Sequence, residues 1–237
     1  MNQYDGTLVA YSLRLLNDDY TGDAITVRRA SDNATQGIGF VDGVLDVASL
    51  ETFCSGTDGF VTTWYDQNGS GENAFITTAS AQPQIVSSGS VLTSFGKPAI
   101  YFDGVNDILD SNITDSTYKQ MFVVKDSVGG NTVVALSGSV QLLINQYNTI
   151  NDDVTFTNKL GLYTVDNQNT KCYLDGVDET GAATVFTQTF NRLRLGAINT
   201  SAGFSEGYIS EVILYTTDQA ANRTAIESNI NDYYNIF

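Results

Sequence analysis

The sequence predicts an all-β sandwich, and three observations lead to that prediction. Apolar runs of four to eight residues recur along the chain, and Gly, Asn, Asp and Ser bound them. Aromatic residues make up 11% of the chain and only two prolines occur, as in strand-rich globular proteins. No composition shift or linker divides the sequence, so we expect a single domain over residues 1–237. The clearest predicted strands are Ala24–Arg29, Phe60–Tyr65, Ala99–Phe102, Gln120–Lys125, Thr132–Leu136, Val140–Ile144, Gly161–Val165, Lys171–Leu174, Arg192–Leu195 and Tyr208–Tyr215.

Three segments have the spacing of helices. Leu8–Leu16 has apolar residues at helical intervals, and Val47–Phe53 follows Asp46, which suits an N-cap. Near the end of the chain, Asp218–Tyr234 places Ala221, Ile226, Ile230 and Tyr233 near one face. We expect this last helix to pack against the sandwich, with the Tyr-rich residues 233–237 either packing it or forming an assembly contact.

The predicted turns combine Asp with Gly, because Gly adopts positive φ freely and Asp tolerates it. Asp42-Gly43, Asp103-Gly104 and Asp175-Gly176 are therefore predicted hairpin turns. Before the last of them, Cys172 and Leu174 should face one side of their strand and Tyr173 the other.

The charge excludes several classes of function. The chain has 27 acidic and 11 basic residues, a net charge of −16 and no histidine. An acidic surface repels phosphates, so we expect no nucleic-acid partner. Without histidine, there can be no His-based catalytic triad or His zinc site. Any chemistry must rest on carboxylates, Tyr, Lys or backbone groups.

The cysteines, the length of the apolar runs and the N-terminal residues each give a further expectation. Cys54 and Cys172 have no CxxC spacing, so we expect two buried, reduced thiols rather than a metal site or a disulfide. No apolar run reaches membrane-spanning length, so no membrane partner is expected. The N-terminal residues lack the basic start of a signal peptide, which predicts retention in the producing cell or another route out.

Several stretches, in order, resemble the catalytic module of fungal-type α-L-arabinofuranosidase B (glycoside hydrolase family fifty-four) and its bacterial and phage-borne relatives. The most distinctive is Tyr65-Asp-Gln-Asn-Gly-Ser-Gly71, and the resemblance is strongest over residues 10–104. It implies a concanavalin A-like (laminin-G-like) jelly-roll sandwich, in agreement with the strand count. The other matching stretches are Ala10-Tyr-Ser-Leu-Arg-Leu-Leu16, Ala24–Asn33, Leu45–Cys54, Gln82–Val86, Lys97–Gly104, and Leu195-Gly196 through Gly207–Glu211.

The resemblance carries over only part of the family's chemistry. Its proton-donating Asp falls on Thr200, and the string around its nucleophilic Glu is not found in residues 105–190, where Glu179 is the lone Glu. The family's disulfide partner for Cys54 falls on Gly59, and the family's secretion signal and arabinose-binding module have no counterpart here. From these departures we expect no catalytic residues.

Polar residues near the strand ends are candidates for binding. Asp66, Asn68, Asn199 and Glu206 lie where they would hold a sugar on a concave face. For Asp66, Gln67 and Asn68, the alternative is that their side chains cap a local turn. Trp64 is either a sugar platform or a core residue.

No cofactor is expected, with calcium as the alternative. Its oxygen ligands would come from Asp103, Asn106 and Asp107 or from Asn151, Asp152 and Asp153, although ordinary turn chemistry also explains both sets.

From these features we expect a non-catalytic, lectin-like structural protein of a bacteriophage virion, as a capsid decoration, fibre or tail component. Its partners would be other virion proteins or further copies of itself, and polysaccharide. It would be located in the virion assembled in the host cytoplasm, or else be extracellular. The alternative is an α-L-arabinofuranosidase-like glycoside hydrolase acting on polysaccharide with relocated carboxylates, for which Glu206 and Glu211 are the candidates.

Overall fold

The computed structural model describes residues 5–113, 118–130, 132–138, 141–145, 149–150, 154–155, 160–166, 171–179, 190–198, 200–201 and 203–237. The strands of the first half are β1 (Thr7–Ser12), β2 (Ile25–Arg29), β3 (Thr35–Ile38), β4 (Phe40–Val41), β5 (Val44–Leu45), β6 (Gly59–Trp64), β7 (Ala74–Phe75), β8 (Gln84–Ser87), β9 (Ser90–Val91), β10 (Thr93–Ser94), β11 (Lys97–Pro98), β12 (Ile100–Asp103) and β13 (Leu109–Ser111). Those of the second half are β14 (Gln120–Gly130), β15 (Thr132–Gly138), β16 (Gln141–Asn145), β17 (Thr149–Ile150), β18 (Val154–Thr155), β19 (Leu160–Asp166), β20 (Lys171–Leu174), β21 (Val177–Asp178), β22 (Phe190–Leu195) and β23 (Ser205–Tyr215). The helices are α1 (Val47–Phe53), a 3₁₀ turn (Ala79–Ala81) and α2 (Arg223–Tyr234).

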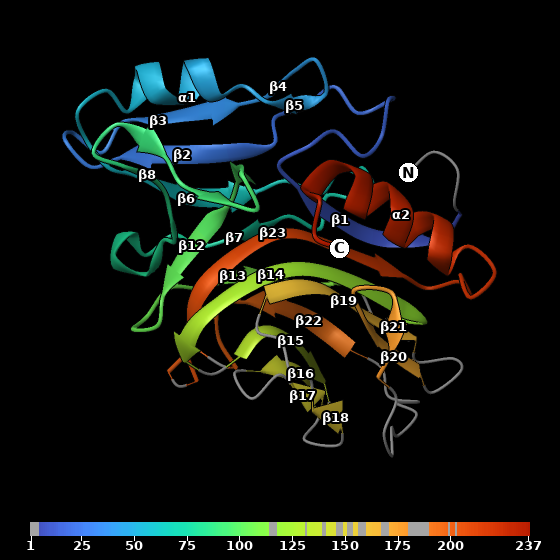
Figure 1. The fold of residues 1–237 in the computed structure, drawn as a ribbon. Helices are drawn as coiled ribbons and strands as arrows, with labels where there is room; N and C mark the ends of the chain where they lie inside the picture. Colours follow the sequence, from blue (N-terminus) through green and yellow to red (C-terminus); the bar gives the residue numbers. More distant parts are fainter. Residues whose placement is uncertain are drawn as a thin grey trace.

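The strands form two antiparallel layers. One layer runs β21–β20–β19–β14–β23, and β1 and β12 pair one after the other along the free edge of β23. The other runs β3–β2–β6–β7–β13–β22–β15–β16–β17–β18. Figure 1 shows the strands β22, β15 and β16 beneath the curved strands β23 and β14. The predicted all-β sandwich is confirmed, as is each predicted strand.

The main core lies between the layers and takes side chains from both. Trp64 on β6, Phe102 on β12 and Leu193 on β22 are all within 1% of complete burial. Trp64 is therefore a core residue, and the sugar platform is excluded by its burial. Cys54 and Cys172 are both buried in the same core and are not joined in a disulfide, which confirms the predicted pair of buried, reduced thiols.

A second, smaller core lies on the outer side of the β1–β23–β14 layer, beneath α2 (Figure 1). Ile226, Ile230 and Tyr234 of α2 are buried there against residues such as Phe122 and Tyr215. The helix begins at Arg223, later than the predicted Asp218, because residues 218–222 form turns in which Asp218 Oδ1 accepts the Ala220 N–H.

The predicted helix over Leu8–Leu16 is wrong. Residues 7–12 form β1, which pairs with β23 from Thr7↔Tyr215 to Ser12↔Glu211. One face of β1 packs on the main core and the other face is covered by the second core. The three consecutive residues Val9, Ala10 and Tyr11 are therefore all buried. A strand buried on both faces has a continuous apolar run, which periodicity alone does not separate from a buried helix.

The short elements follow their local sequence closely. Asp46 caps α1 by accepting the Ser49 N–H at 3.0 Å, as predicted. Asp42-Gly43 and Asp175-Gly176 have positive φ at both residues and close the hairpins β4–β5 and β20–β21. Asp103-Gly104 ends β12 without forming a hairpin, contrary to the prediction, because β12 pairs with β23 and β8 rather than with β13.

Within the described part of the chain, neither helix is long and apolar enough to cross a membrane.

Candidate functional site

The motif Tyr65–Gly71 follows β6 in the chain and contacts β1 through hydrogen bonds. Asp66 is 2% exposed, and its carboxylate accepts the N–H groups of Ala10, Asn68 and Ser70 and the Ser70 hydroxyl. These bonds leave no room for a sugar hydroxyl, so the geometry supports capping as the role of Asp66.

The next two residues of the motif complete this connection. Gln67 is fully buried; its Nε2 donates to the carbonyls of Ser12 and Arg14, and its Oε1 accepts the Leu16 N–H. The Asn68 side chain donates to the Thr7 carbonyl at 2.8 Å. We call residues 66–68 the β1 latch, since they satisfy backbone groups along the whole strand.

The solvent-facing side of the β12–β23–β14 layer carries a different set of polar groups, which we call the tyrosine–acid face: Tyr101, Asp103, Glu206, Tyr208 and Asp126. Tyr101 lies opposite Tyr208, and Asp103 lies opposite Glu206, in the register of β12 and β23. Asp126 of β14 lies opposite Tyr208 on its other side. All five side chains are partly or fully exposed, whereas the neighbours Phe102 and Ile209 point into the core.

Contacts across the strands fix the positions of these side chains. The rings of Tyr101 and Tyr208 have centroids 5.0 Å apart, and the Tyr101 hydroxyl bonds Glu206 Oε1 at 3.2 Å. Asp103 Oδ1 accepts the N–H groups of Val105 and Asn106. None of the ion pairs found in the described ranges involves Asp103, Glu206 or Asp126. Three carboxylates are thus available around two half-exposed rings.

The strand carrying Glu206 can lie this close to β14 because residue 207 is glycine. Its φ is 148°, and a Cβ there would lie 2.4 Å from the Asp126 carbonyl oxygen. A side chain at position 207 would push the two strands apart and displace the tyrosine–acid face.

Two pKa values are raised here, one of a residue of this face, Tyr101, and one of a buried neighbour, Asp107. Burial, followed by the nearby charge of Asp103, raises the pKa of Asp107 to about 7. Burial, together with the charge of Glu206, raises the pKa of Tyr101 to about 12. Asp107 is only 6% exposed and accepts the Asp103 N–H, so it supports the turn from below.

The candidate calcium ligands have ordinary turn contacts. Asp103 and Asp107 accept backbone N–H groups of their own turn, and Asn151, Asp152 and Asp153 lie outside the described residues. Over the described ranges, no group of three or more Cys, Asp or Glu side chains is placed to hold a metal ion.

Glu211, the second candidate carboxylate for an enzyme, is sealed beneath α2. It is 1% exposed, and Arg14 bonds both of its oxygens, at 2.8 and 3.0 Å. The Ser12 hydroxyl also donates to it at 2.8 Å. Along β23, Glu211 is five residues from Glu206, about 16 Å in an extended strand, whereas catalytic carboxylates lie about 5–9.5 Å apart. These two residues therefore do not form a catalytic pair.

The resemblance also draws attention to Thr200, Asn199, Gly59 and Glu179. Thr200 is exposed in the loop before β23, which closes on itself through a bridge between Ala197 and Phe204. Asn199 lies outside the described residues. A Cβ on Gly59 would be 2.7 Å from Cys54 Sγ, so position 59 is where a disulfide partner for Cys54 would stand. Glu179 is exposed just after β21.

Sequence reasoning did not single out three members of the tyrosine–acid face: Tyr101, Tyr208 and Asp126. Alternation along Ile100-Tyr101-Phe102-Asp103 does place Tyr101 and Asp103 on one side of a strand. What brings Glu206 and Tyr208 beside them is the pairing of β12 with β23, two strands far apart in sequence, and no local signal indicates it.

The fold and this face together define a two-sheet β-sandwich with carboxylates and tyrosines gathered on its surface, an arrangement that suits recognition of carbohydrate. A protein-family model described as "Alpha-L-arabinofuranosidase B, catalytic" matches residues 6–99. The chain thus resembles the catalytic module of α-L-arabinofuranosidase B, most clearly in the same N-terminal stretch that carries the motifs.

Curated relatives match over part of that stretch. The chain is 42% identical over 62 residues to alpha-L-arabinofuranosidase B of Penicillium canescens, covering 25% of this chain and 13% of that protein. It is 41% identical over 61 residues to an arabinofuranosidase/β-xylosidase of Trichoderma koningii, covering 25% of this chain and 12% of that protein. The matched stretch is thus a small share of each relative's length.

Solved structures share the fold over nearly the whole chain. A GH54 α-L-arabinofuranosidase soaked with a cyclic sulfate inhibitor superposes with a TM-score of 0.64 at 13% identity, covering 94% of this chain and 62% of that one. An arabinofuranosidase complexed with arabinofuranosyl-α-1,2-xylobiose superposes with a TM-score of 0.62 at 14% identity, covering the same shares. The expected jelly-roll architecture is confirmed by this likeness.

These findings correct the functional expectation. A non-catalytic bacteriophage virion protein is contradicted, because the matching family model and the relatives quoted above are arabinofuranosidases. The missing motifs weighed too heavily in that expectation. Losing the sequence match at Thr200 and in residues 105–190 does not remove carboxylates that strand pairing supplies from elsewhere, such as Asp103.

Proposed function

We propose that the chain is a glycoside hydrolase of the α-L-arabinofuranosidase type that acts on polysaccharide. The observation that carries the proposal is the match of residues 6–99 to the catalytic module of α-L-arabinofuranosidase B. The same stretch holds β1 and the β1 latch, and it ends at the residue before β12, the strand that carries Tyr101 and Asp103. The shared fold over 94% of the chain is consistent with this proposal.

Asp103 and Glu206 are the proposed catalytic pair. Side chains directly opposite each other on antiparallel strands have Cβ atoms about 4.5–5.5 Å apart. Retaining glycosidases hold their two carboxyl groups about 5–5.5 Å apart, whereas inverting enzymes need about 6.5–9.5 Å to admit a water molecule. The opposed register of Asp103 and Glu206 therefore favours retention of configuration.

The surroundings of each carboxylate suit one of the two roles. The Tyr101 hydroxyl bonds Glu206 Oε1 and so orients Oε2 for attack on the anomeric carbon. Asp103 is fixed through Oδ1 by two backbone N–H groups, which leaves Oδ2 to protonate the departing oxygen and then to deprotonate water. The half-exposed rings of Tyr101 and Tyr208 would pack against the apolar side of the sugar.

The test is release of 4-nitrophenol from 4-nitrophenyl α-L-arabinofuranoside. We expect turnover by the unmodified chain, and the first-formed product, followed by proton NMR, should keep the α configuration. Absence of turnover would refute the proposed function. A product of inverted configuration would refute the Asp103–Glu206 pair while leaving the activity in place.

A matched control separates this pair from the one Glu in the poorly matching middle of the chain. Glu179 is exposed and lies away from both strands of the proposed pair, so Glu179→Gln should leave turnover unchanged. If Glu179→Gln abolished turnover instead, the nucleophile would be Glu179 and the proposed site would be wrong.

A further inference from the structure

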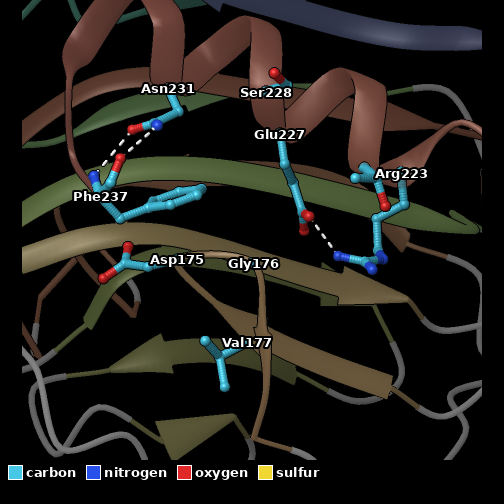
Figure 2. Close-up of a pocket in the computed structure, with 9 residues that line it drawn as sticks. Asp175, Gly176, Val177, Arg223, Glu227, Ser228, Asn231 and Phe237 are labelled. Carbon is cyan, nitrogen blue, oxygen red and sulfur yellow. Dashed lines mark hydrogen bonds and ion pairs between the residues drawn. The ribbon is translucent and has the colours of Figure 1, made fainter.

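A pocket of about 390 Å³ lies between α2 and the β20–β21 hairpin, apart from the tyrosine–acid face. Figure 2 shows Glu227 and Arg223 reaching down from the helix, with Asp175 and Val177 below them and the Phe237 ring at one side. The volume is in the range of small-molecule sites, which begins at about 300 Å³. Nothing in the proposed hydrolysis uses these residues.

Glu227 is buried in this pocket with half of its carboxylate unused. The residue is 3% exposed, and its Oε2 is paired with Arg223 Nη1. Its Oε1 is buried and meets no hydrogen-bond donor in the described ranges, although the side chain points into the pocket (Figure 2). Buried acceptors are nearly always satisfied, so an unsatisfied one beside a cavity is open to a donor that enters the cavity, either a water molecule or a ligand.

The other polar groups are held in place by the fold. The Arg223 guanidinium carbon lies 3.8 Å from the centroid of the Tyr173 ring, so the ring and Glu227 together fix the cation. Asp175 occupies the β20–β21 turn with one oxygen bonded to the Leu162 N–H. The pocket thus offers donors from Arg223 and acceptors from Glu227 and Asp175.

The remaining wall is apolar and exposed. Phe237 is 55% exposed and Val177 is 60% exposed. Asn231 fixes the backbone of Phe237, accepting its N–H at 2.9 Å and donating to its carbonyl oxygen. These bonds fix the backbone from which the exposed ring projects at the side of the pocket.

We propose that this pocket is a second carbohydrate-binding site, for a neutral sugar unit, separate from the catalytic face. A cation would require acceptors alone and would be repelled by Arg223, while an anion would be repelled by Glu227 and Asp175. A neutral sugar has hydroxyls that both donate and accept, and an apolar face that packs on an aromatic ring. This combination matches fixed donors, fixed acceptors and the exposed Phe237 ring in one pocket.

Affinity electrophoresis in gels containing soluble arabinoxylan tests the proposal, with mobility divided by that in a gel without polysaccharide to remove the effect of charge. The unmodified chain should be retarded, and Phe237→Ala should weaken the retardation about fivefold. Glu227→Gln should weaken it as well, because the buried acceptor loses its charge. Phe75→Ala is the matched control, since Phe75 is another exposed phenylalanine, 45% exposed on β7.

Equal retardation of the unmodified chain, Phe237→Ala and Phe75→Ala would overturn the proposal, as would an unmodified chain that runs freely. Binding of n-butylammonium that Glu227→Gln abolishes, without retardation by arabinoxylan, would overturn it in favour of a cation site. Release of 4-nitrophenol is measured on the same variants and should be unchanged. Loss of hydrolysis with retained binding would count against the proposed function alone. Loss of binding with retained hydrolysis would count against this pocket alone.

Discussion

Two glutamates of β23 lie on the same outer side of the sheet and have opposite surroundings. Glu206 is near the start of the strand, which we call its open end, and Glu211 is in its second half, which we call its sealed end. Glu211 is 1% exposed, bonded through both oxygens to Arg14 and covered by α2. Glu206 is half-buried, and its hydrogen bond to a described side chain is the one from the Tyr101 hydroxyl. A neutralised carboxylate serves structure, whereas an open one beside a second carboxylate can serve chemistry.

The largest effect should come from the open end. Glu206→Gln removes a catalytic carboxylate under the proposed function, so turnover of 4-nitrophenyl α-L-arabinofuranoside should fall by a factor of about 10²–10⁴ or more. Its urea unfolding midpoint should stay near that of the unmodified chain, because no ion pair is lost. A variant with full turnover would show that the open end is not catalytic.

The sealed end should respond in the opposite way. Glu211→Gln leaves the buried Arg14 without its counter-charge, and the expected cost is about 3–5 kcal/mol of unfolding free energy. Urea unfolding followed by tyrosine and tryptophan fluorescence measures it. Arg14→Met together with Glu211→Leu should recover much of the loss, since no buried charge then lacks a partner; failure to recover would mean that the pair is more than a neutralised contact.

Asp107 beneath the open end should make stability depend on pH. Its folded pKa of about 7 lies above the ordinary aspartate value of about 3.9, so the folded state binds the proton more tightly than the unfolded state. The stability from this protonated carboxyl is complete below about pH 4 and is lost as the pH rises through about 7, by about 2–4 kcal/mol. Unfolding at pH 4.5 and pH 8 measures the loss, and Asp107→Asn should reduce it; an equal loss in that variant would assign it to other groups.

The smallest effects should come from one hydroxyl at each end. Tyr234→Phe removes the bond to the Ser210 carbonyl at the sealed end and should cost about 1 kcal/mol of stability, seen as a lower urea midpoint. Tyr101→Phe removes the bond to Glu206 at the open end and should lower turnover severalfold with little change in stability. If the two variants exchanged these effects, the distinction between the ends would be wrong.

Much of the fold was predictable from sequence, because most of the long strands carry their own apolar pattern and their own turn residues. β1 was mistaken for a helix because it is buried on both faces, so its pattern reflects tertiary packing rather than local structure. The hairpin predicted at Asp103-Gly104 failed because β12 pairs with distant strands. The site was predictable only in part. In the sequence, Glu206 and Glu211 are both simply glutamates of one strand. Their roles differ because β12 lies beside Glu206, whereas α2 covers Glu211.

The same limit explains why the sequence left two roles open for the Tyr65–Gly71 motif, sugar binding and local capping. A loop with Asp, Gln and Asn resembles a ligand-binding loop in sequence. Its carboxylate and amides instead bond backbone groups of β1, an earlier strand, and only the folded structure reveals those partners.

The β1 latch also bears on the order of events during folding. β1 pairs with β23, so that contact joins residues separated by nearly the whole chain, as in Ser12 and Glu211. Closing so long a loop carries a large entropic cost and slows folding. Residues 66–68 are much nearer to β1 and bond the backbone of the same strand. The latch can thus hold β1 in register early in folding, before β23 pairs with it. If so, Gln67→Ala should slow refolding more than it speeds unfolding.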